Sequence, residues 1–151
     1  MPKPIKKKLL NYCFDYLQEK QNNLLDAISD SKNSLDSESQ STAGDKHDTS
    51  RAMMHLEIEK KSHQLNELLK LKKVLNQINI EKSIDKVGLG SVIETDKGSF
   101  FIAINAGKAK IDSIDFTIIS LASPLAQSLA KGINTNSVIV MNRQYRIKSL
   151  Y

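Results

Sequence analysis

Two aspartates three positions apart, Asp45 and Asp48, are the residues of this 151-residue chain whose type and spacing could do chemistry. Gly44 directly precedes them, and a segment with helical periodicity follows. A hard divalent cation prefers carboxylate oxygens, so such a pair could help to hold Mg²⁺. The purely structural alternative is a helix cap, in which both acids oppose the positive end of a helix dipole and Thr42 completes a capping box.

Two long segments with helical periodicity flank this pair. After Pro4, apolar residues recur in steps of three and four, which predicts an amphipathic helix over about residues 5–32. Residues 31–42 are rich in Ser, Asn, Asp and Gln and are expected to form a polar connection or a frayed extension of that helix. Periodicity resumes after Gly44 and predicts a second helix over about residues 46–79.

The second helix would be about 50 Å long, too long for the rest of the chain to surround. Its apolar stripe must then be covered by the first helix, which predicts an antiparallel two-helix coiled coil. We expect this stripe to include Leu69 and Leu71, and we expect Met53 and Met54 to pack in the core, with a soft contact surface as the alternative. Asp45 and Asp48 would then lie in the tip of a helical arm, near residues 36–51.

From residue 84 the pattern changes to short β-branched runs separated by Gly, Asn and Asp. Strands are expected at residues 87–95, 99–104, 109–111, 116–120, 137–141 and 144–151, with turns at 96–98 and at Asn142-Arg143. Ser123 and Pro124 predict the start of a short helix that stops at Gly132. The predicted fold is therefore α+β, with a mostly antiparallel sheet of about five strands and one helix. We assign residues 1–82 to the coiled-coil arm and residues 83–151 to a C-terminal domain.

Composition excludes several classes of function. Only 5% of residues are aromatic and Trp is absent, which argues against a large aromatic-lined pocket. The single cysteine, Cys13, excludes an internal disulfide and a cysteine-cluster zinc site, and its apolar neighbours assign it to the core. No apolar run approaches the ~18 residues of a membrane span. We therefore expect a cytoplasmic protein without a membrane partner, and a formal charge of +5 favours an acidic one.

The order of these elements resembles the GreA/GreB family of bacterial transcript cleavage factors, and two local matches carry the resemblance. Residues 44–49, Gly-Asp-Lys-His-Asp-Thr, are similar to the family's Gly-Asp-x-x-Glu-Asn at the same architectural place. Residues 123–132, Ser-Pro-Leu-Ala-Gln-Ser-Leu-Ala-Lys-Gly, and the closing strand resemble the family's second motif. In the family this second unit belongs to an FKBP-like domain, so the resemblance implies an FKBP-like C-terminal domain here.

The resemblance implies an accessory factor to RNA polymerase and not a free-standing enzyme. Family members bind bacterial RNA polymerase near its secondary channel and insert the coiled coil. By this resemblance Asp45 and Asp48 would be the catalytic pair and would share Mg²⁺ with the polymerase while a backtracked transcript is hydrolysed. It also implies a monomeric, cytoplasmic, DNA-binding transcription elongation factor that has no intrinsic cofactor and meets nascent RNA only within the polymerase complex.

Two other functions stay open. Asp48 stands where the family has Glu, Thr49 replaces Asn, and Arg51 stands where an acidic residue often sits. These departures favour a non-cleaving regulator that competes with cleavage factors for the secondary channel. The second alternative is a structural interaction protein, whose coiled coil dimerises with itself or with another helical partner.

Overall fold

The computed structural model describes the backbone of residues 2–39, 45–82 and 84–151, and the side chains of residues 4–37, 49–82 and 84–151. The chain forms two compact units, one of residues 16–72 and one of residues 1–15 together with 73–151. Helix α1 (Pro2–Ser39) and helix α2 (Asp45–Asn76) contribute to both units. The assignment of residues 1–82 and 83–151 to separate domains stays a prediction.

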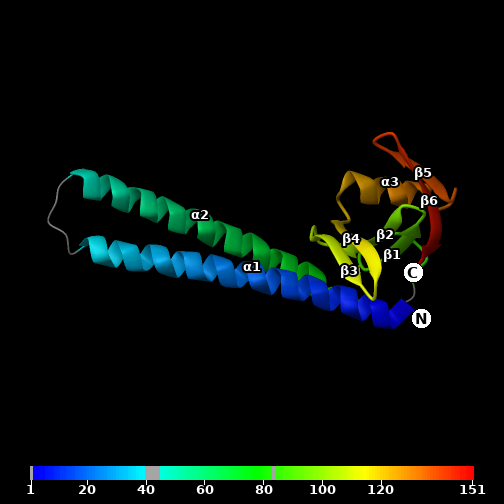
Figure 1. Cartoon of the computed structure of the whole chain (residues 1–151), viewed down its shortest axis with the longest axis horizontal. Coiled ribbons are helices and arrows are strands. Elements are labelled where there is room, and N and C mark those ends of the chain that lie inside the picture. The colour runs from blue at the N-terminus through cyan, green and yellow to red at the C-terminus, as the bar shows by residue number, and fades with distance from the viewer. Residues whose placement is uncertain (1, 40–44, 83) are drawn as a thin grey trace. The chain divides into compact units, whose positions relative to one another are not determined.

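In the unit of residues 16–72, α1 and α2 lie side by side and run in opposite directions (Figure 1). Their buried and half-buried side chains include a run that recurs in alternating steps of four and three. We call these positions the seam: Leu17, Gln21, Leu24, Ile28, Ser31 and Leu35 of α1, and Met54, Ile58, Lys61, Leu65, Leu68 and Lys72 of α2. Heptad spacing of this kind keeps one stripe of each helix turned toward its neighbour. The predicted long helical region is confirmed.

The polar segment after residue 31 extends α1 as far as Ser39, which is one of its two predicted forms, and residues 40–42 lie outside the described residues. The helix continues to Ser39, and Leu35 within this segment is buried. Leu35 falls four residues after Ser31 and so continues the heptad spacing. One apolar residue in register is enough to keep a polar turn of helix packed along its neighbour.

A polar pair interrupts the apolar seam. Lys72 Nζ donates to Gln21 Oε1 at 2.6 Å and reaches Gln18 Oε1 at 3.4 Å. Because Gln21 and Lys72 both occupy seam positions, a shift of one helix along the other would leave two partly buried polar groups without each other. The pair therefore favours one register of α1 against α2.

Three apolar residues of α2 do not pack as predicted. Leu69 and Leu71 are exposed, and Met53 is 66% exposed. None of the three falls on a heptad position of the seam, whereas Met54 and Leu68 do. The expectation that these residues belong to the packed stripe is wrong, because they were assigned to it by their apolar type and their exact spacing from the seam positions was not considered.

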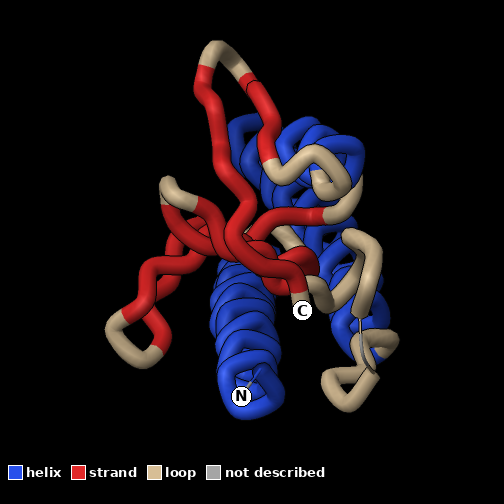
Figure 2. The backbone as a smooth tube through the Cα atoms, turned by 90° about the vertical axis from the view of Figure 1, so that its right-hand side faces the viewer, coloured by secondary structure: helices blue, strands red, loops and turns tan. Residues whose placement is uncertain are grey.

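The unit of residues 1–15 and 73–151 is built on one six-stranded sheet (Figures 1 and 2). The strands are β1 (Val92–Thr95), β2 (Gly98–Ala103), β3 (Gly107–Ile111), β4 (Ile114–Ser120), β5 (Ser137–Val140) and β6 (Arg143–Leu150). Their order across the sheet is β3-β4-β2-β1-β6-β5, and helix α3 (Pro124–Gly132) connects β4 to β5. The fold class is α+β, as predicted.

The sheet is mostly antiparallel, as predicted, but it is mixed, because one pair of the described strands is parallel, and it has six strands where about five were predicted. Strands β2 and β4 run parallel, with Ser99 opposite Phe116 and Ala103 opposite Ser120, while the other pairs are antiparallel. Every residue of β2 after Gly98 is buried. A strand that is apolar on both faces belongs in the middle of a sheet, where it has a neighbour on each side. Here the neighbours of β2 are β1 and β4, and β3 lies beyond β4 at the edge.

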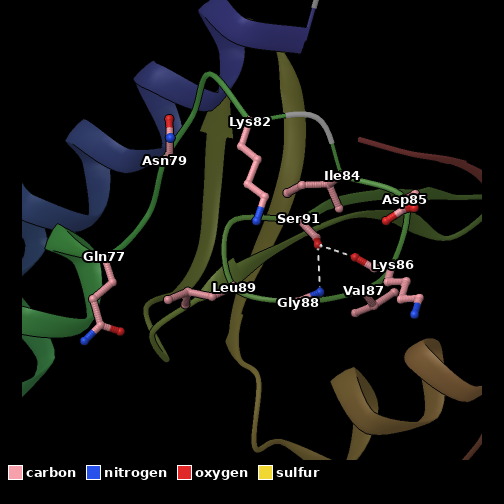
Figure 3. Close-up of a pocket in the computed structure, with 10 residues that line it drawn as sticks. All are labelled: Gln77, Asn79, Lys82, Ile84, Asp85, Lys86, Val87, Gly88, Leu89 and Ser91. Atoms are coloured by element: carbon pink, nitrogen blue, oxygen red, sulfur yellow. Dashed lines mark hydrogen bonds between the residues drawn. The ribbon is translucent and has the colours of Figure 1, made fainter.

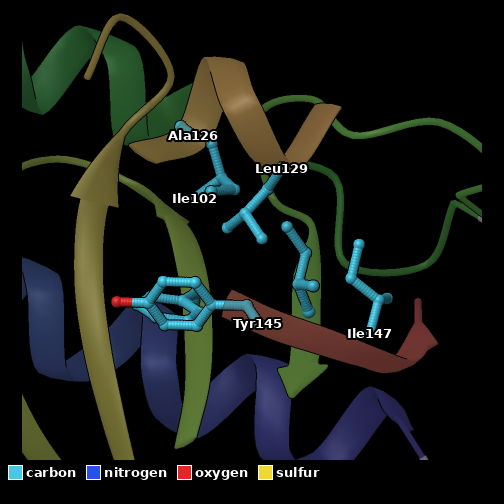
Figure 4. Packing of buried hydrophobic residues seen from close by; sticks show 7 residues of the cluster. Ile102, Ala126, Leu129, Tyr145 and Ile147 are labelled. Carbon is cyan, nitrogen blue, oxygen red and sulfur yellow. The ribbon is translucent and has the colours of Figure 1, made fainter. Parts of the chain in front are cut away.

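Helix α3 covers one face of this sheet (Figure 4). The apolar cluster beneath it consists of Ile93, Phe100, Ile102, Ala126, Leu129, Tyr145 and Ile147. The helix starts as predicted, because Ser123 Oγ accepts a hydrogen bond from the Ala126 N–H at 3.1 Å and Pro124 follows the cap. This fixed start sets Ala126 and Leu129 over the sheet.

The first turns of α1 lie against the opposite face of the sheet (Figure 2). Lys8 Nζ forms an ion pair with Asp112 at 2.7 Å, and Lys6 Nζ lies 5.8 Å from the centre of the Tyr151 ring. Leu9 and Cys13 are fully buried in the same unit, which confirms the prediction that Cys13 is a core residue. The sheet is therefore covered on both faces.

Two turns differ from their predicted places. Strand β1 begins at Val92 and not near residue 87, because the Gly88 N–H donates to Ser91 Oγ at 2.9 Å and Gly90 adopts a φ of 90°. The β5–β6 turn is centred on Met141 and Asn142, with φ values of 50° and 64°, one residue earlier than predicted. Two consecutive positive φ values are what a two-residue hairpin needs.

Candidate functional site

The predicted site positions fall together at the start of α2. Asp45 is the first residue of the helix, and Asp48 lies in its first turn. Positions three apart lie on the same side of a helix, so the backbone brings the two positions within one turn of each other. The side chains of Asp45 and Asp48 lie outside the described residues, as does Thr42, and their roles stay predictions.

The start of a helix is a favourable place for negative charge. Its first N–H groups have no partners inside the helix, and the aligned peptide dipoles leave a partial positive charge there. Two aspartates at this place suit a hard cation such as Mg²⁺, which binds carboxylate oxygens. Because Mg²⁺ requires an octahedral shell, two carboxylates would leave most of it to other groups.

The outward face of the next two turns of α2 is apolar and exposed. Met53 and Leu56 are 66% and 64% exposed, and Ala52 between the turns is exposed as well. Met53 and Leu56 are three positions apart and so share one side of the helix. Reasoning from the sequence preferred core packing for Met53 over a contact surface and did not single out Leu56. The signal that could have revealed the surface is that neither residue falls on a heptad position of the seam.

The two units differ in the sign of their charge. In sequence, residues 16–72 hold ten acidic and eight basic side chains, whereas residues 1–15 and 73–151 together hold seven acidic and fourteen basic ones. The excess positive charge of the chain therefore belongs to the unit with the sheet.

A polar hollow lies between the end of α2 and β1 (Figure 3). It is lined by Gln77, Asn79, Lys82, Ile84, Asp85, Lys86, Val87, Gly88, Leu89 and Ser91. The Ser91 hydroxyl accepts from the Gly88 N–H at 2.9 Å and donates to the Lys86 carbonyl at 3.4 Å. Since both hydrogen bonds hold the turn before β1, the hydroxyl is structural and is not a nucleophile.

The buried ionisable groups of the sheet unit are also structural. Burial raises the pKa of the Cys13 thiol to about 12, which removes it as a nucleophile at neutral pH. Burial, followed by a 3.1 Å hydrogen bond to Glu94, raises the pKa of Tyr151 to about 12. Burial lowers the pKa of Lys6, whose amine contacts the face of the Tyr151 ring. These contacts fasten α1 to the sheet.

Within the residues whose side chains are described, no three His, Cys, Asp or Glu side chains gather into a metal site. The helices of that same part of the chain include none long and apolar enough to cross a membrane. No protein-family model, curated protein or solved structure matches the chain. The first turn of α2 is thus a candidate site on the strength of its own residues.

Proposed function

We propose that this chain is a Gre-like transcription elongation factor that binds bacterial RNA polymerase through the secondary channel and assists cleavage of backtracked transcripts. The observation that carries the proposal is the placement of Asp45 and Asp48 in the first turn of α2. The proposal includes a coiled-coil arm, an FKBP-like C-terminal domain and a monomeric cytoplasmic protein. A mixed sheet with α3 across one face supports the FKBP-like description.

The chemistry asked of this chain is small and specific. A Mg²⁺ ion shared with the polymerase would supply Lewis-acid chemistry at the scissile phosphate and would lower the pKa of a bound water. Asp45 and Asp48 each offer a carboxylate from one helical turn, and they orient the water for in-line attack on the transcript. The polymerase remains the enzyme, and this chain contributes no cofactor of its own.

The surroundings of the turn support delivery into a partner. Met53 and Leu56 present apolar surface to the outside just after the acidic turn, where they can contact the wall of a channel. Since α1 and α2 pack on each other through the seam, their remaining faces in the unit of residues 16–72 are exposed. The positive charge of the sheet unit favours an acidic docking surface on the polymerase.

Stalled elongation complexes with a backtracked, end-labelled transcript test the proposal. The wild-type chain should shorten the transcript in the presence of Mg²⁺, and Asp45→Asn should slow shortening by about 100-fold, because several kcal/mol of transition-state stabilisation is lost. Asp30→Asn is the matched control, since Asp30 is an exposed carboxylate of α1 away from the start of α2. Equal shortening by wild type and Asp45→Asn would remove the catalytic assignment.

Asp48→Glu provides a gain-of-function test. The longer side chain restores the family's glutamate, so it should reach the shared ion more readily and raise the rate of shortening. A rate below that of wild type would show that the first turn holds its ligands in a different geometry from the family.

A non-cleaving regulator of the same channel is the second candidate. The observation in its favour is Arg51, an exposed cation two turns into α2 that lowers the local negative charge. This role predicts that the chain binds core polymerase, leaves the transcript uncut and inhibits cleavage by an active factor. Stable self-association without polymerase binding would favour the structural interaction protein instead.

A further inference from the structure

We propose that the open edge of β5 binds an extended acidic peptide of another protein, which adds to the sheet as a further strand. We call the region the β5 edge surface and define it by Lys131, Ile139, Met141, Arg143 and Arg146. This surface belongs to the unit with the sheet and does not involve the acidic turn of α2. The inference is therefore independent of the proposed function.

Strand β5 offers backbone groups for pairing. It lies at the end of the strand order and, among the described strands, pairs with β6 alone. Val140 and Arg143 close the two-residue turn and form a hydrogen-bonded pair. Because such pairs alternate along an antiparallel ladder, the next pair, Ile139 and Gln144, is a non-hydrogen-bonded pair. The N–H and C=O of Ile139 consequently point away from β6, toward the open edge. They are the groups that an added strand would meet.

The side chains at this edge are apolar and accessible. Ile139 is 70% exposed and Met141 is 93% exposed. The opposite edge of the sheet is different, because β3 presents Lys108 and Lys110, which are exposed. Lysine on an edge strand prevents unwanted pairing, whereas exposed Ile and Met invite it. The contrast between the two edges of one sheet indicates that the β5 edge is available for pairing with another strand.

Charge identifies the partner as acidic. Residues 116–151 contain Lys131, Arg143, Arg146 and Lys148 but no Asp or Glu. Arg143 and Arg146 lie opposite Val140 and Ser137 in the ladder, and both side chains are exposed. A strand laid along the open side of β5 would be separated from these two cations on β6 by β5 itself, about 10 Å, which a long arginine side chain can span, and Asp or Glu in that strand would complement them.

A hollow beside β5 gives the added strand a place for a side chain. It lies between α3 and β5 and is lined by Ser128, Lys131, Gly132, Ser137, Val138 and Ile139. None of these lining residues is aromatic, and Tyr145 of the neighbouring strand β6 is buried. Because bases bind single-strand sites by stacking on accessible aromatic rings, the surface fits a peptide better than a nucleic acid.

Nuclear magnetic resonance of the full, isotope-labelled chain tests the inference. The probe is a seven-residue peptide that alternates Val with Asp or Glu, and the control peptide carries Lys at the acidic positions. The acidic peptide should shift the amide signals of residues 137–141 and slow the hydrogen exchange of the Ile139 amide. The basic peptide should do neither.

Two variants locate the binding. Ile139→Lys should weaken the acidic peptide about tenfold, since an edge lysine disfavours strand addition and about one hydrogen bond's worth of binding energy is lost. Arg143→Glu combined with Arg146→Glu should weaken it by a similar factor and keeps the test decisive if Ile139→Lys does not fold. Ile114→Lys is the control, because Ile114 is an exposed apolar residue at the other end of the sheet.

The following results would overturn the inference: equal binding of the acidic and basic peptides, unchanged binding by both edge variants, or displacement of the peptide by a single-stranded oligonucleotide that shifts the same signals. Protection of the Ile139 amide that rises with protein concentration alone would assign the edge to a second copy of this chain. None of these measurements includes polymerase, so their outcome is separate from that of the cleavage assay.

Discussion

Replacing Gly132 by alanine should destabilise the sheet unit, although the same change in an ordinary helix is stabilising. Gly132 is the last residue of α3 and is buried against β5. A Cβ atom there would come within 2.9 Å of the Ser137 carbonyl oxygen and 2.9 Å of Val138 Cβ. Neither contact involves the flexible end of a side chain, so α3 and β5 must move apart.

Two opposing effects decide whether Gly132→Ala raises or lowers the free energy of unfolding. The higher helix propensity of alanine favours the variant by at most about 1 kcal/mol, and by less at the end of a helix. Overpacking of a filled site costs about 1–3 kcal/mol. Because the obstructing atoms include backbone, we expect overpacking to win and the free energy of unfolding to fall by about 1–2 kcal/mol.

Urea unfolding followed by circular dichroism measures this difference. Gly88→Ala is the matched control, since a Cβ at Gly88 meets nothing within 4 Å. The control should change the free energy of unfolding by less than about 0.5 kcal/mol. A Gly132→Ala variant as stable as wild type, or more stable, would refute the close packing of α3 on β5.

Three further predictions concern the helix cap, the seam and the buried thiol. Ser123→Ala should lower the free energy of unfolding by about 1 kcal/mol in urea titrations, because the Ala126 N–H loses its acceptor. An unchanged free energy of unfolding would show that the cap does not stabilise the fold. Lys72→Leu combined with Gln21→Leu should raise the thermal midpoint and also promote self-association in sedimentation experiments, since two partly buried polar seam residues give way to apolar ones. A double variant that melts earlier and stays monomeric would contradict that role. Cys13 should resist thiol reagents in the folded chain, and its contribution to stability should be complete below about pH 8.5, the pKa of a free thiol. That contribution should be lost as the pH rises toward about 12, because the folded state holds the proton more tightly. Fast labelling of the native chain at pH 8 would disprove this.

Local signals in the sequence predicted most elements of the fold. The helical period predicted both long helices, Ser123 and Pro124 predicted the start of α3, and β-branched runs predicted the strands. These signals act within a few residues, so they do not depend on distant contacts. Which strands pair with each other does depend on distant contacts, and for this reason the parallel pairing of β2 with β4 was not predicted. The unbroken burial of β2 is the long-range constraint that decides it.

The candidate site was only partly accessible to the same reasoning. The sequence predicted that Asp45 and Asp48 stand at the start of a helix, and the backbone places them there. Of the exposed pair, Met53 was assigned to the core by its type, with a contact surface as the less favoured alternative, and Leu56 was not singled out. Exposure depends on which side of the helix a residue occupies, and that follows from its heptad position relative to the seam.

The proposed function requires the first turn of α2 to enter the catalytic centre of RNA polymerase. A photoreactive side chain at Ala52, an exposed position one turn after Asp48, tests it most directly in stalled elongation complexes. The same group at Leu25, an exposed residue of α1, is the control. We predict crosslinks from position 52 to the 3′ end of the transcript and none to it from position 25. Bound complexes in which position 52 crosslinks only to the outer surface of the polymerase would contradict the claim.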